Sequence, residues 1–342
     1  MKTNQLLFTV LLLVTAAVFQ LPAQQNEADR KVLVEIRAGA DKGDAKARYE
    51  LGRAFFSGTL GVAKDETEAV KWFRKAAEQN VADAQFSLGV CYAIGQGVMK
   101  DDAEAVQWYR KAAEQNYARA QYNLGVRYTK GQGVAKDDAE AVQWFRKAAE
   151  QNYARAQYNL GVRYTKGQGV AKDDAEAVKW FRKAAEQNDA RAQAALGVRY
   201  AKGQGVAKNK AEAVKWYRKA AEQNVADAQY NLGVCYAIGQ GVTEDDAEAV
   251  KWFRKAAEQN YADAQYNLGV CYDSGEGVAK DEIEAYKWWL LAAGHGNDDA
   301  KYNMTIVENK MTREQIAEGQ RLARDFKPRK VPPEGSDARL PP

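Results

Sequence analysis

The sequence is poor in the residues that build most catalytic and metal sites, since its 342 residues include one histidine, three cysteines and six prolines. A lone histidine and dispersed cysteines cannot make a zinc site, and no cysteine stands in a pattern that pairs it with a histidine base. The scarcity of proline, together with glycines that recur at fixed positions, favours short helices joined by tight turns. We therefore expect a helical protein that has no metal, no cofactor and no enzymatic activity.

Neither sign of charge dominates, because 50 basic residues face 46 acidic ones and leave a net charge of +4. Proteins that bind nucleic acid usually carry a basic excess across the whole domain. We therefore expect the partner of this protein to be something other than nucleic acid.

Long apolar runs are also missing, apart from residues 6–18. Lys2 precedes this run and Leu21, Pro22 and Ala23 follow it, in the order of a signal peptide with its cleavage site. The run is shorter than the roughly 20 residues of a membrane span. We expect residues 1–23 to be a bacterial-type signal peptide and the mature protein to be exported, periplasmic or secreted, without stable membrane insertion. An uncleaved signal anchor is the alternative.

Most of the remaining sequence consists of seven copies of one repeat. Residues 120–154 read AQYNLGVRYTKGQGVAKDDAEAVQWFRKAAEQNYA, and residues 156–190 differ from them at two positions only. A fixed period of this length indicates a solenoid, in which each unit buries its apolar face against its neighbours. The expected repeats span residues 46–298, at about 46–82, 83–118, 119–154, 155–190, 191–226, 227–262 and 263–298. We expect an N-terminal capping helix in residues 24–45, a C-terminal half-repeat with a capping helix in residues 299–327, and a disordered tail in residues 328–342.

Each unit predicts two antiparallel helices. In the first helix Ala120, Leu124 and Tyr128 form one apolar stripe. Gly125 beside it permits close approach of another helix, and Gly131 ends the helix in the left-handed conformation. The second helix begins at Asp137 as N-cap, with Glu140 three residues later, and ends at Asn152. Helices this short are marginal alone, so stacking between repeats must stabilise them. At the C-terminal end, Thr312 and Gln315 predict a capping box that opens the last helix.

The repeated pattern A-x-x-x-L-G-x-x-Y-x-x-G-x-G-V-x-x-D-x-x-E-A-V-x-W-[FY]-R-K-A-A resembles the Sel-one-like repeat, a relative of the tetratricopeptide repeat. The resemblance covers about residues 46–303. It implies an all-α fold, a right-handed α-α superhelix of helical hairpins, that serves as an adaptor for protein complexes and performs no chemistry. In related tetratricopeptide folds the first helices line a concave groove, where side chains in the slots of Tyr122 and Asn123 contact extended peptides.

The three cysteines, Cys91, Cys235 and Cys271, occupy the same slot of their repeats. A disulfide between Cys235 and Cys271 is possible only if both side chains face the seam between their helices, because packed helix axes lie roughly 8–10 Å apart. Buried free thiols are the interpretation that we favour.

Specificity should lie where the copies differ. The first helices of repeats three to five carry arginine and lysine where the other repeats carry aspartate, cysteine, isoleucine or serine, and tyrosine and asparagine recur beside these slots. Stacked repeats are expected to align these residues into a basic stripe. The candidate binding residues are Arg119, Tyr122, Asn123, Arg127, Lys130, Arg155, Tyr158, Asn159, Arg163, Lys166, Arg191, Arg199, Lys202, Tyr230 and Asn231. They suit an acidic segment, through charge-assisted hydrogen bonds and aromatic packing.

The leading hypothesis for function is an exported, non-enzymatic scaffold that binds a protein or peptide along this groove, with an acidic segment as its proposed ligand. One alternative is a cell-wall or carbohydrate binder, which the tyrosines and asparagines would also suit. Another is a β-lactam-binding hydrolase, as implied by cysteine-rich relatives that carry two cysteines per repeat, whereas this chain has at most one. The sequence leaves the oligomeric state open.

Overall fold

The computed structural model describes residues 27–329, and every regular element among them is an α-helix. The fold class expected from the sequence is therefore confirmed. The expected signal peptide and residues 330–342 of the expected tail lie outside the described residues. Within the described range, no helix is both long and apolar enough to cross a membrane.

Residues 27–41 form the first described helix, and seven helical hairpins follow it. The hairpins pair α2 (Ala45–Ser57) with α3 (Glu66–Ala77), α4 (Ala82–Ile94) with α5 (Asp102–Glu114), α6 (Ala118–Lys130) with α7 (Asp138–Glu150), α8 (Ala154–Lys166) with α9 (Asp174–Glu186), α10 (Ala190–Lys202) with α11 (Lys210–Glu222), α12 (Ala226–Ala237) with α13 (Asp246–Glu258), and α14 (Ala262–Ser274) with α15 (Glu282–Gly294). Two more helices, α16 (Asp298–Glu308) and α17 (Arg313–Asp325), complete the described chain.

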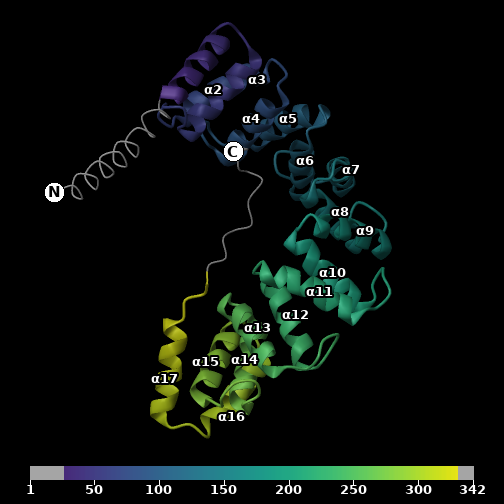
Figure 1. Ribbon diagram of the computed structural model, residues 1–342, viewed down its shortest axis with the longest axis vertical. Helices are drawn as coiled ribbons and strands as arrows, with labels where there is room; N and C mark the ends of the chain where they lie inside the picture. Colours follow the sequence, from purple (N-terminus) through teal and green to yellow (C-terminus); the bar gives the residue numbers. More distant parts are fainter. Residues whose placement is uncertain (1–26, 330–342) are drawn as a thin grey trace, which may run out of the picture. The chain divides into compact units, whose positions relative to one another are not determined.

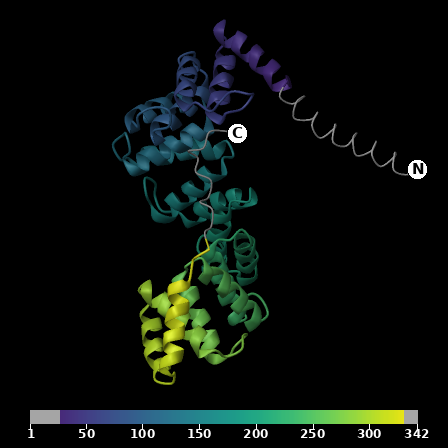
Figure 2. The ribbon, with the colours of Figure 1, turned by 90° about the vertical axis from the view of Figure 1, so that its left-hand side faces the viewer.

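The described chain divides into two compact units, residues 27–148 and residues 149–329, with the boundary inside α7. Inside each unit a first helix packs against the second helix of its own hairpin and against the second helix of the preceding one. Figures 1 and 2 show this stacking of successive hairpins, from purple to teal in the N-terminal unit and from teal to yellow in the C-terminal unit.

The helix ends follow the local rules that the sequence suggested. The Asp137 carboxylate accepts hydrogen bonds from the amides of Ala139 and Glu140, both at 2.9 Å, so Asp137 is the expected N-cap. Gly131 ends α6 with a φ of 65°, and Asn152 has a φ of 65° just after α7. Both residue types tolerate the left-handed conformation, which explains why they recur at these positions.

The mid-helix glycine marks the close approach of the two helices in each hairpin. A Cβ atom added to Gly125 would lie 2.8 Å from the ring of Phe145 and 3.1 Å from the carbonyl oxygen of Ala141. The ring fills the space that any side chain at residue 125 would need, so the predicted close contact is confirmed.

A ladder of buried glutamines ties one repeat to the next. Gln193 is 2% exposed and donates from Nε2 to the carbonyl of Ala185 at 3.2 Å and to Oδ1 of Asn188 at 3.0 Å. Ala185 and Asn188 belong to the preceding repeat, whereas its Oε1 accepts from Nε2 of Gln223, at the end of the second helix of its own repeat, at 2.8 Å. Since both hydrogens and the oxygen of the Gln193 amide group are engaged, the buried amide is a specific link between neighbouring repeats.

The last helix of the C-terminal unit packs differently from the second helices of the repeats. α17 begins with the expected capping box between Thr312 and Gln315. It packs on α15, where Gly319 lies so near Tyr286 that an added Cβ would be 2.7 Å from the ring. Trp288 and Phe326 meet edge to face, with 5.5 Å between ring centroids. α17 thus covers α15 of the last full hairpin.

Candidate binding surface on the first helices

We use the name first-helix face for the side of a first helix that carries candidate residues in repeats three to six, and it is described in each unit separately. In the N-terminal unit it belongs to α6. The guanidinium of Arg119 lies 4.8 Å from the ring centroid of Phe86, on the preceding first helix. Asn123 donates from Nδ2 to the carbonyl of Arg119 at 3.0 Å, and Lys130 is exposed in the last turn. Stacking on an aromatic ring holds the Arg119 side chain in place on this face.

Arg127 plays a different part on the same helix. Its Nη1 lies 2.6 Å from Oδ1 of Asp102, the first residue of the preceding second helix. Only 13% of the Arg127 side chain is exposed. The ring of Tyr122 packs against the ring of Phe145, with 5.8 Å between their centroids. Arg127 and Tyr122 therefore contribute mainly to packing between and within repeats.

The C-terminal unit repeats this division of roles on α8 and α10. Arg191 lies 4.7 Å from the ring centroid of Tyr158 and is paired with Asp189 at 2.8 Å. Arg199 is bound to Asp174 at 3.0 Å and donates to Oγ1 of Thr165 at 3.0 Å. Arg199 is thus the counterpart of Arg127.

The remaining candidates divide by exposure. Arg163 is buried at 8% exposure, whereas Arg155 and Asn159 are half-buried. Lys166 and Lys202 are exposed in the last turns of their helices, as Lys130 is. The three lysines are therefore the candidate cations that water reaches most freely.

In repeat six the candidate residues contact other residues of their own repeat. Tyr230 packs against Phe253 and Tyr261, with centroids 6.0 and 5.3 Å apart. Asn231 donates from Nδ2 to the carbonyl and to the carboxylate of Asp227, at 2.7 and 3.1 Å. Asp227 also accepts from the hydroxyl of Tyr261 at 3.1 Å. Asp227 thus stands in the slot that Arg119, Arg155 and Arg191 occupy in repeats three to five.

The ion pairs between repeats were not anticipated from the sequence, although a signal for them exists. Asp102 and Asp174 each stand 25 residues before the arginine that they bind. In repeat five the aspartate is replaced by Lys210, and the following repeat then has Cys235 in place of an arginine. Each arginine in this slot, at residues 127, 163 and 199, follows an aspartate 25 residues earlier, as expected if the two side chains meet.

The cysteines are free thiols, with Cys91 and Cys235 buried and Cys271 half-buried. Burial raises the pKa of Cys91 to about 12 and, with smaller charge effects, the pKa of Cys235 and of Cys271 to about 11. Such thiols are almost fully protonated at neutral pH and make poor nucleophiles. His295 is exposed, and among residues 27–329 no three His, Cys, Asp or Glu side chains gather closely enough to hold a metal ion.

A thiol titration checks this environment. At pH 8 the folded protein is expected to react slowly with an aromatic disulfide reagent, because the raised pKa leaves little thiolate and burial blocks access. After denaturation all three cysteines should react at once. Fast reaction of all three thiols in the folded protein would contradict the burial described above.

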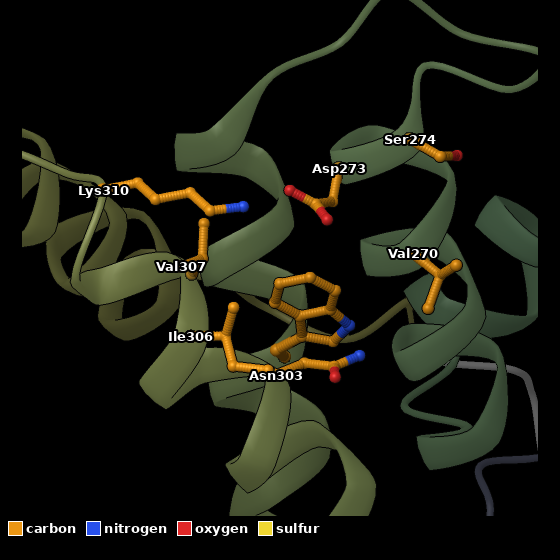
Figure 3. Close-up of a pocket in the computed structure, with 8 residues that line it drawn as sticks. Val270, Asp273, Ser274, Asn303, Ile306, Val307 and Lys310 are labelled. Carbon is orange, nitrogen blue, oxygen red and sulfur yellow. The ribbon is translucent and has the colours of Figure 1, made fainter.

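A small hollow lies at the C-terminal end of the C-terminal unit, outside the candidate residues. Its volume is about 160 Å³, and it is lined by Val270, Asp273, Ser274, Trp289, Asn303, Ile306, Val307 and Lys310. Figure 3 shows the side chains of Asp273 and Lys310 extending toward each other across it. Its size is small for a drug-sized ligand, whose pockets usually span about 300–1,000 Å³.

The repeats match the sequence profile of the Sel1 repeat at residues 45–81, 82–117, 118–153, 154–189, 190–225, 226–261 and 262–297. This chain belongs to the Sel1 repeat family. The crystal structure of a Sel1 repeat protein from Oxalobacter formigenes is 36% identical over 72% of this chain and 96% of that one, with a TM-score of 0.64. A protective antigen of uropathogenic Escherichia coli with an SLR fold is 31% identical over 87% of this chain and 79% of its own, with a TM-score of 0.43.

A curated relative of this Sel1 repeat protein comes from a plant. It is the ERAD-associated E3 ubiquitin-protein ligase component HRD3A of Arabidopsis thaliana, 38% identical over 58 residues. The matched stretch is 17% of this chain and 9% of the relative. The likeness therefore concerns the repeat and covers a small part of that protein.

Proposed function

We propose that this Sel1 repeat protein is an exported, non-enzymatic scaffold that binds an acidic protein or peptide segment on its first-helix face. The observation that carries the proposal is the exposure of Lys130, Lys166 and Lys202 at the same slot of three first helices. At the other ends of α6 and α10, Arg119 and Arg191 are held against aromatic rings, Arg191 being paired with Asp189 as well, so little side-chain freedom is lost when a ligand carboxylate binds there. The naming of one relative as a component of a ubiquitin ligase agrees with a role in protein assemblies.

A carbohydrate ligand has less support from the geometry. Sugar binding by aromatic residues needs an open ring face, whereas the rings of Tyr122, Tyr158 and Tyr230 tilt against the phenylalanine of their own hairpin at 41–47°. The tyrosines thus serve the packing of the hairpins. The three thiols give the hydrolase alternative little support as nucleophiles, because burial raises their pKa values.

Export is proposed from the arrangement of Lys2, the apolar run 6–18 and the sequence Leu21, Pro22 and Ala23. Mass spectrometry of the protein recovered from the envelope of an exporting host is expected to find Gln24 as its first residue. Recovery from the cytoplasm with the first 23 residues attached would contradict export.

The binding proposal is tested by capturing partners with the purified protein and measuring their affinity for a charge-reversed variant. Replacing Lys130, Lys166 and Lys202 by Glu is expected to weaken binding of the captured partner by about 10-fold or more at low salt, because three attractions become repulsions. Added salt should weaken binding to the unmodified protein as well.

The matched control places the same charge change on second helices. Lys179, Lys215 and Lys251 are exposed there and form only surface pairs with the glutamate three residues earlier. Replacing these three by Glu should leave affinity within about twofold of the unmodified protein, since distant exposed charges are screened. Equal loss in the two triple variants, or no loss in the first, would contradict the proposed site.

A further inference from the structure

Helix 27–41 has the character of a second helix. The amide of Gly43 donates to the carbonyl of Ala40 at 3.1 Å, just as the amide of Asn80 donates to Ala77 at 3.0 Å after α3. Gly43 and Asn80 share a positive φ, of 95° and 66°. The turn from helix 27–41 to α2 is therefore of the same kind as the turn from α3 to the next repeat. Among residues 27–329, however, no first helix pairs with helix 27–41.

α16 has the opposite character, that of a first helix without a second. In the preceding repeat Gln265 is buried and Gly269 lies under the ring of Trp289. Lys301 and Thr305 occupy these two slots in α16, and both are exposed. The face that its own second helix would cover is open, because α17 packs on α15.

Both open faces present apolar side chains to water. On helix 27–41, Val32 lies one turn before Ile36 and is 44% exposed. On α16, Tyr302 is 69% exposed and Ile306 is 41% exposed, at the edge of the hollow of Figure 3. The end units of an isolated solenoid normally have a polar outer face, and these two faces carry exposed apolar side chains instead.

We propose that α16 of one molecule binds helix 27–41 of a second copy, so that the two half-hairpins complete each other. The interface required is the contact between first and second helices that the chain already forms in each of its seven hairpins. The side chains at the centre of this contact compensate each other in size. Thr305 is larger than the glycine in the same slot of α14, and Ile36 is smaller than Phe73, the aromatic residue in the same slot of α3.

The contact joins two different surfaces and is therefore heterologous. Every molecule carries one copy of each surface, so association proceeds head to tail and grows with concentration. A single helix pair buries a small area, which favours a weak and reversible contact.

The test is sedimentation velocity of the purified protein from about 1 to about 300 µM, the range in which small interfaces associate. The unmodified protein is expected to show a weight-average mass that rises with concentration beyond that of a dimer. Val32→Asp and Ile306→Asp should each stay monomeric, with association weakened at least 10-fold, because each buries an unpaired carboxylate in the contact. A protein that is monomeric at every concentration would overturn the proposal.

Mixing the two variants identifies the surfaces. Val32→Asp keeps an intact α16 and Ile306→Asp keeps an intact helix 27–41, so an equimolar mixture should form a dimer and nothing larger. Ile238→Asp, which changes an exposed isoleucine inside a full repeat, should associate like the unmodified protein. Tyr302→Glu repeats the test of α16, and helix content of each variant is checked by circular dichroism. A mixture that stays monomeric while the unmodified protein associates would also overturn the head-to-tail contact.

Discussion

Gly205→Ala is expected to lower the free energy of unfolding by about 3 kcal/mol or more, the sum of left-handed strain and a backbone collision. Gly205 has a φ of 71°, and an added Cβ would lie 1.9 Å from the carbonyl oxygen of Asp174 at the start of α9. Backbone on both sides prevents either atom from moving away cheaply. Urea unfolding followed by circular dichroism measures the loss.

Gly296→Ala separates the strain from the collision. Gly296 has a φ of 87°, and nothing lies within 4 Å of the position of its added Cβ. The expected loss is therefore the conformational term alone, about 1 kcal/mol. Equal losses in the two variants would show that the contact between the loop and α9 contributes little to stacking.

Gln193→Leu is expected to destabilise the protein by about 2–3 kcal/mol although leucine is more apolar and of similar size. The carbonyl of Ala185 and the side chains of Asn188 and Gln223 would each lose a hydrogen-bond partner. The carbonyl is the costly loss, because its bond to Gln193 is buried and water cannot replace it easily. Thermal and urea unfolding both report the change.

Gln265→Leu is the matched control for the ladder. Gln265 also bonds a carbonyl and an asparagine, at Ala257 and Asn260, but its buried Oε1 has no partner. His295 stands in the slot where the second helix of this repeat would otherwise end with the glutamine partner. Leucine here removes the unpaired Oε1, so we expect a loss in the free energy of unfolding that is less than half the loss caused by Gln193→Leu. A larger loss at residue 265 would contradict the role of the ladder between repeats.

The parts of the fold that depend on local rules could be predicted from the sequence. Asp137 caps its helix, Gly131 ends one and Thr312 opens the last, because each of these effects needs only neighbouring backbone atoms. Gly125 was assigned to close packing because a glycine in the middle of a helix costs stability unless a neighbour needs the space.

The contacts between repeats could be predicted only in part. The pairing of Arg127 with Asp102 depends on how a first helix lies against the start of the preceding second helix, which a repeat period does not specify. The docking of α17 on α15 depends on Tyr286 and Gly319, two residues that depart from the repeat pattern. Binding itself stays a prediction at the candidate residues, of which the three lysines are exposed and Arg127 and Arg199 are engaged in ion pairs.

Site-specific photocrosslinking to a captured partner tests the central claim, that ligands bind on the first helices, most directly. A photoreactive residue is placed at Lys166 on α8 in one variant and at Lys179 on α9 in the other, both positions being exposed. The account predicts a covalent adduct from residue 166 and none from residue 179. Adducts from residue 179 alone would place the partner on the second helices and contradict the account.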